Sequence, residues 1–138
     1  MAAIAAARQF ASADAQITLL HVIPAEAQAV AREAPQALLG RWHGRSTEAF
    51  QSIAVQVASG LLADAQALLG RDATLNAQSG RVGEVVVAAA QKTDLLVVAR
   101  DCDHVGEGPH SLGPTARYVV DHSPCSVLLV WSDQADAT

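Results

Sequence analysis

The sequence has 138 residues, a mass of 14.3 kDa, a net charge of -5 at pH 7 and two cysteines. A chain of this length fits one core, so we expect residues 1–138 to form a single domain. Hydrophobic residues make up 51% of the chain and charged residues 17%, which excludes intrinsic disorder. Nine basic residues against 14 acidic ones provide no basic face for nucleic acid.

The sequence also indicates the cellular compartment in which we expect the protein. No stretch approaches the roughly 18–20 continuous apolar residues of a membrane span, so we expect no membrane segment. The apolar residues 1–7 do not form a signal peptide, because the positive charge of Arg8 follows them instead of preceding them. Two cysteines suit a reducing compartment, and we therefore expect a cytoplasmic protein.

The first half of the chain contains a helix, a strand and a long helix. Residues 2–12 carry apolar side chains at helical spacing. Residues 17–23 are continuously apolar, as strands buried on both faces are. Breaks at Pro and Gly make residues 24–45 irregular, with at most a short helix over 26–33. Residues 46–69 form the long helix, and the face expected to point inward comprises Phe50, Ile53, Val57, Leu61, Ala65 and Leu68.

The second half repeats the alternation of strands and helices. The expected elements are a short strand over 73–77, a helix over 81–92, a doubly buried strand over 95–99, a helix over 113–122 and a last strand over 126–131. Connections of this length require parallel pairing and right-handed crossovers, which predicts an α/β fold with helices on both faces of a parallel sheet. Ligands of such sheets bind beyond the carboxyl ends of the strands, here after Val22 and after Ala99.

Four stretches resemble the universal stress protein family. They are residues 17–22 (ITLLHV), 80–86 (GRVGEVV), 94–98 (DLLVV) and 112–130 (LGPTARYVVDHSPCSVLLV). Their order and spacing are similar to the family along nearly the whole chain. The resemblance implies a flavodoxin-like or Rossmann-like three-layer α/β sandwich whose mainly parallel sheet has the strand order 3-2-1-4-5. It also implies a stress-response function without enzymatic activity.

The resemblance further implies where a nucleotide would bind. Some members of the family bind ATP, and others have lost the ability to bind it. In the binders, a pattern of Gly, two residues, Gly, nine residues and Gly-Ser or Gly-Thr holds the phosphates, while the adenine lies near the ends of the first two strands. Carried onto this chain, the candidate nucleotide site comprises Val22, Ala99, Arg100, Cys102, Gly113, Pro114 and Thr115.

This candidate site departs from the family pattern. Ala99 and Cys102 replace the two leading glycines, and a Cβ there obstructs the close approach of a phosphate. Ten residues instead of nine separate Cys102 from Gly113. Pro114 replaces the Ser or Thr and removes an amide donor and a hydroxyl, for which Thr115 is a partial substitute. We therefore expect a weak or non-functional site and no cofactor. The alternative is an ATP- or AMP-binding member with a remodelled loop and weak ATP hydrolysis.

The family's first strand has no counterpart, because the chain begins inside the helix that follows it. In the family's order that strand is the centre of the sheet, so its neighbours would have unpaired backbone groups, each costing about 1–3 kcal/mol if buried. Three explanations are open: a truncated version of a longer gene product, a rearrangement of the flanking strands, or a partner that fills the gap. The last makes the chain a structural half of a tandem or paired assembly, a second alternative function.

The resemblance also implies a homodimer through the last strand. An exposed apolar edge needs cover, which a second copy supplies by pairing with it. The residues expected at this interface are Val127, Leu129 and Trp131.

Two further groups of residues have the side-chain types of a catalytic site and of a metal site. Ser111, Asp121 and His122 follow the chain order of a serine hydrolase, but Ser111 lies well beyond the end of its strand, and neighbouring helix residues point in different directions. Ligand-type side chains gather in one loop, but their spacing matches no standard zinc motif. They are Asp101, Cys102, Asp103, His104, Glu107 and His110. We expect neither a catalytic nor a metal site.

Overall fold

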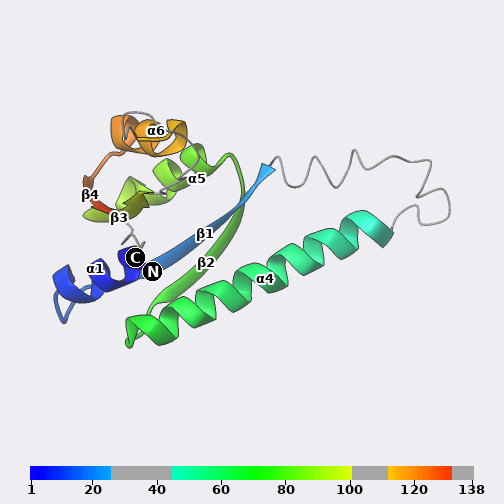
Figure 1. Ribbon diagram of the computed structural model, residues 1–138, viewed down its shortest axis with the longest axis horizontal. Coiled ribbons are helices and arrows are strands. Elements are labelled where there is room, and N and C mark those ends of the chain that lie inside the picture. Colours follow the sequence, from blue (N-terminus) through cyan, green and yellow to red (C-terminus); the bar gives the residue numbers. More distant parts are fainter. Residues whose placement is uncertain (26–44, 101–111, 132–138) are drawn as a thin grey trace, which may run out of the picture.

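The computed structural model describes residues 1–25, 45–100 and 112–131 (Figure 1). Its elements are α1 (Ala2–Phe10), β1 (Thr18–Pro24), α4 (Arg45–Leu69), β2 (Thr74–Gly80), α5 (Val82–Ala89), the short 3-10 helix η1 (Ala90–Lys92), β3 (Leu95–Arg100), α6 (Pro114–His122) and β4 (Ser126–Trp131). The helices and strands expected within these ranges are present, with small shifts at their ends. The short helix expected over residues 26–33 lies outside the described residues.

The helices form two layers with the strands between them. In Figure 1, α5 and α6 lie above the strands, and α1 and α4 lie below them. α4 packs on β1 and β2, and α1 packs on β3 and β4 and also touches α4. On the other face, α5 packs on β1 and β2 and touches α6. The chain is therefore the expected three-layer α/β sandwich.

The four described strands form two separate parallel pairs. β1 pairs with β2, with Thr18 opposite Thr74, and β3 pairs with β4, with Leu95 opposite Ser126. The expected parallel pairing is confirmed. No described strand joins the two pairs, so they are held together by the helices that pack on them.

Burial of the strands is lower than the sequence predicts. In β1, Leu19 and Ile23 are buried at 8% exposure, while His21 and Val22 are half-buried. In β3, the side chains from Leu96 to Ala99 are half-buried, and Leu95 is exposed. Helices cover both faces of β1, as expected, but the side chains of β1 and β3 are less buried than those of an interior strand, because each strand has a described neighbour along one edge alone.

An arginine joins the two turns at one end of the β1–β2 pair. The Arg71 guanidinium donates to the backbone carbonyls of Ser12, Ala13 and Ala15, each at 2.9 Å. Arg71 follows α4, and the three carbonyls lie between α1 and β1. Three charge-assisted hydrogen bonds fix these turns together, which aligns the start of β1 with the start of β2.

The inward face of α4 differs from the expected one. Ala58, Leu62 and Leu69 are buried, and Leu62 and Leu69 pack with Leu19 of β1 in one cluster. Four residues of the expected stripe are exposed instead, Ile53 and Val57 at 56%, Leu61 at 51% and Leu68 at 46%, whereas Ala65 is half-buried against the cluster as expected. The side chain of Phe50 lies outside the described residues. The two stripes are one residue, or about 100°, apart on the helix. Both satisfy helical spacing, and the stripe with the small Ala58 is the one that approaches the sheet.

Part of α4 also meets the length and composition of a membrane span. Gln51–Leu69 has a mean hydropathy of 1.4, the one such segment among the residues described, and 17% of it is buried. The same segment carries the residues that pack on β1. Its apolar character therefore has a role in the core of the sandwich.

The two neighbouring leucines of α4 provide a direct test of this packing. We expect Leu62→Ala to lower the free energy of unfolding by about 2–5 kcal/mol, because it leaves a cavity beside Leu19. Leu61→Ala, the matched control on the exposed stripe, should change it by less than about 1 kcal/mol. Urea unfolding followed by circular dichroism measures both values. Equal losses, or a larger loss for Leu61→Ala, would contradict the observed orientation of α4.

Candidate functional site

The N-terminus of α6 carries three residues of the candidate nucleotide site. Gly113 is the N-cap, with φ -62° and ψ 164°, and Pro114 is the first helical residue. The first turn closes where the Arg117 amide donates to the Gly113 carbonyl at 3.0 Å. Gly113, Pro114 and Thr115 are all exposed. The predicted helix start is therefore confirmed, and the amides of Thr115 and Ala116 are those that the first turn leaves without helical partners.

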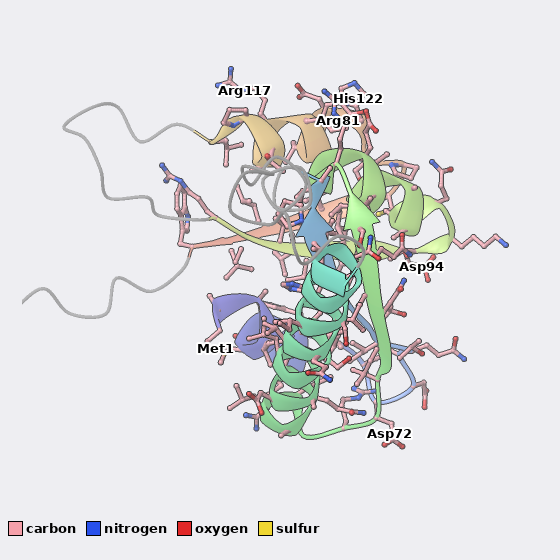
Figure 2. The ribbon with its side chains drawn as sticks, turned by 90° about the vertical axis from the view of Figure 1, so that its right-hand side faces the viewer. Met1, Asp72, Arg81, Asp94, Arg117 and His122 are labelled. Carbon is pink, nitrogen blue, oxygen red and sulfur yellow. The ribbon has the colours of Figure 1, made fainter. Side chains whose placement is uncertain are left out.

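Glycine at position 83 sets the distance between α5 and α6. A Cβ on Gly83 would lie 2.7 Å from Cδ1 of the Tyr118 ring, closer than packed atoms approach. Tyr118 in turn stacks on His122, with ring centroids 4.0 Å apart. Figure 2 shows Arg117 and His122 of α6 at the same end of the molecule as Arg81, the N-cap of α5. The close packing of α6 on α5, and with it the position of the α6 N-terminus, therefore depends on glycine at position 83.

The carboxyl end of β3 carries two further candidate residues. Ala99 is half-buried, and Arg100 is buried at 9% exposure. The Arg100 guanidinium carbon lies 4.2 Å from the centroid of the Trp131 ring, a cation–π contact. Arg100 lies directly opposite Trp131 in the β3–β4 register. Both residues are candidates from the sequence, whereas their contact is not predicted there; pairing residues 95–100 with 126–131 in parallel register would have indicated it.

The two halves of the candidate site lie on different strand pairs. Val22 is half-buried in β1, opposite Gln78 of β2. Ala99 and Arg100 belong to β3, which pairs with β4. No described strand connects the two pairs. Cys102 lies outside the described residues, so the structure shows Val22, the end of β3 and the start of α6 as three separate groups.

The remaining sequence candidates fall largely outside the described ranges. Ser111 and the loop cluster of possible metal ligands, residues 101–110, are not among the described residues. In the rest of the chain, as far as it is described, no group of three or more His, Cys, Asp or Glu side chains is arranged to hold a metal ion. Asp121 and His122 are exposed on α6, and His122 Nδ1 lies 2.8 Å from the Tyr118 carbonyl. That contact, with the stacked ring, gives His122 a structural role at the end of α6.

Comparison with known proteins identifies the family to which the chain belongs. A sequence model of the Universal stress protein family matches residues 2–130. The chain belongs to the universal stress protein family. The four stretches that carry the resemblance all lie inside the matched residues, so the expectation drawn from them is confirmed. No curated protein sequence is significantly similar to the chain.

Solved structures share the fold at low sequence identity. The universal stress protein UspA from Lactobacillus plantarum is 20% identical with a TM-score of 0.54, over 93% of this chain and 83% of that one. Hypothetical protein PH0823 is 14% identical with a TM-score of 0.64, over 98% and 89%. Hypothetical protein MJ0577, from a study of function assignment by structure, is 18% identical with a TM-score of 0.58, over 96% and 88%. At these identities the likeness establishes the flavodoxin-like fold.

Proposed function

We propose that this universal stress protein is a non-enzymatic, cytoplasmic stress-response protein whose nucleotide site has degenerated. The observation that carries the proposal is Pro114 in the first turn of α6. A helix N-terminus binds phosphate through its unpaired amides and its dipole. Proline contributes no amide, and it stands where the family's ATP binders have a hydroxyl side chain.

The arrangement of the strands supports the same proposal. A nucleotide in such a fold spans the carboxyl ends of neighbouring strands. In the family's order 3-2-1-4-5 the first strand joins the two strands that correspond to those of Val22 and Ala99, whereas among the described strands of this chain none joins the two pairs. Ala99 also presents a methyl group where the family's phosphate loop has glycine, which obstructs a close phosphate. A site with fewer donors and separated halves is expected to hold ATP or AMP weakly.

The ATP affinity and its response to one substitution test the proposal. We expect a Kd weaker than about 100 μM for Mg-ATP, and about tenfold tighter binding in Pro114→Ser, a gain of about 1.4 kcal/mol. The gain has a physical cause, because serine restores one amide and one hydroxyl to the first turn of α6. Isothermal titration calorimetry measures both affinities.

The control for this test is Pro124→Ser, an exposed proline beyond the other end of α6. It should leave the ATP affinity unchanged. Nanomolar to low-micromolar binding by the unmodified chain would contradict a degenerate site. That result would favour the second candidate, an ATP- or AMP-binding member whose loop between β3 and α6 is remodelled.

The proposal includes a homodimer formed through β4. Val127 and Leu129 of this strand are half-buried, and Trp131 at its end is 59% exposed. β4 pairs with β3 along one edge, and among the described strands its other edge has no partner. An apolar strand with an open edge pairs readily with a second copy. The Trp131 ring, already held on one face by Arg100, is a preorganised aromatic anchor of the kind that interfaces use.

Truncation of Trp131 tests this dimer. We expect the unmodified chain to be dimeric at micromolar concentration, and Trp131→Ala to raise the dimer Kd by about tenfold or more. Val55→Ala, which shortens an exposed side chain of α4, is the control and should leave the Kd unchanged. Sedimentation equilibrium gives all three constants. A monomeric unmodified chain, or equal constants for the two variants, would argue against an interface at β4.

A further inference from the structure

The outer side of α4 carries a row of exposed apolar side chains. Ile53, Val57 and Leu61 follow one another at intervals of four residues, and each is more than half exposed. Residues four apart form a ridge along the surface of a helix, and we call this row the α4 ridge. It lies about 100° around the helix from Ala58 and Leu62, which are buried. Packing of α4 on the strands therefore leaves the ridge uncovered.

Gly60 leaves a gap beside the ridge. A Cβ on Gly60 would have no packing neighbour within 4 Å. Its backbone does not require glycine either, since the positive φ angles among the described glycines belong to Gly70 and Gly80. Glycine is among the least favourable residues inside a helix. Neither backbone conformation nor packing among the described residues explains Gly60, whereas the close approach of another chain would.

The α4 ridge and the gap are complementary in shape. Gly60 belongs to the row next to the ridge, where it lies between Gln56 and Asp64 and interrupts the side chains of that row. When two helices pack, the ridge of one fits into the groove beside the ridge of the other. A helix face that has both a ridge and a gap therefore fits a copy of itself. Each copy places its ridge at the other's Gly60, and the two contacts are equivalent, as two-fold symmetry requires.

The charges of α4 favour a second copy over a charged partner or a membrane. Residues 51–69 include no basic residue and one acidic residue, Asp64. Helices that lie on a membrane surface are rich in Lys and Arg, and the net charge of -5 opposes binding to anionic lipid. An uncharged ridge also offers no charge pattern that would select a strongly charged protein. A second copy needs no opposite charge, because its own ridge supplies the matching apolar surface.

We propose that α4 is a self-association surface at which the α4 ridges of two copies of this chain cross at Gly60. The contact uses one helix from each copy, which is less than the roughly 1,600 Å² of a standard stable interface. The association is therefore weak, with a Kd of about 100 μM. It uses a different face from the homodimer proposed at β4, because α4 packs on β1 and β2. It is independent of that contact and of the nucleotide site.

Sedimentation equilibrium over about 1–500 μM protein tests the association. We expect the average mass of the unmodified protein to rise above its value at micromolar concentration, with a Kd of about 100 μM for this step. Trp131→Ala, which alters the contact proposed at β4, should show the same step. A constant mass over the upper part of this range would overturn the proposal. Loss of the step in Trp131→Ala would assign the association to β4 and would also overturn it.

Gly60→Ala separates the role of the gap from that of folding. Alanine favours the helix more than glycine does, so the melting temperature at micromolar protein should rise by about 2–4 °C. The added methyl group fills the gap, so the Kd of the association should rise at least about fivefold. Ser59→Ala, at the neighbouring exposed position outside the ridge, is the control and should leave the Kd unchanged. An unchanged Kd in Gly60→Ala would contradict a crossing at Gly60.

A charge on the ridge tests which face of α4 is used. Val57→Glu should raise the Kd at least about tenfold, because the contact would bury an unpaired carboxylate. Ser59→Glu adds the same charge on another side of the helix and should associate normally. Circular dichroism confirms the fold of both variants, and Gly60→Ala provides the test if Val57→Glu does not fold. Equal effects of the two glutamates would show that net charge, and not the ridge, controls the association.

Phosphatidylcholine vesicles test the alternative occupant of the ridge. The unmodified protein should not sediment with these vesicles, because the ridge is proposed to contact protein. Binding to the vesicles that is lost in Val57→Glu, without self-association in solution, would assign the ridge to a lipid surface and overturn the proposal.

Discussion

Backbone hydrogen bonding is the constraint on which the structure of this universal stress protein depends. Buried amides and carbonyls need partners, and a strand inside a parallel sheet finds them along both edges. Here the four strands that the structure describes are distributed over two pairs, so β1 and β3 each have one described neighbour. The helices hold the two pairs side by side, because α1 and α4 contact each other across one face of the strands and α5 and α6 do so across the other.

The candidate nucleotide site follows from the same constraint. Its residues are attached to elements whose relative positions the sheet would normally fix, namely the ends of β1 and β3. With the strands in two pairs, Val22 and Ala99 are positioned by different sheets, and α6 is positioned by its contact with α5 through Gly83. The weak nucleotide binding that we propose is one expected consequence of this arrangement. Pro114 adds a local loss of donors at the start of α6.

The sequence predicts the local structure well and the tertiary contacts less well. The start of α6 at Gly113 and Pro114 was predictable, because a glycine N-cap and a proline in the first turn act locally. The buried face of α4 was not, since two adjacent apolar stripes fit helical spacing equally and the packing of Leu62 on Leu19 decides between them. The Arg71 contacts and the Arg100–Trp131 stack join residues far apart in the chain, which periodicity does not reveal.

Amide hydrogen exchange of β1 tests the central claim most directly. The account predicts slow exchange at Leu19 and His21, whose amides face β2, and exchange at least about 100-fold faster at Leu20 and Val22, whose amides face the open edge. These residues alternate along one strand, so differences in local stability affect them alike. Residue-resolved exchange followed by NMR gives the four rates. Equal protection at all four amides would show that the second edge of β1 is already paired and would contradict the account.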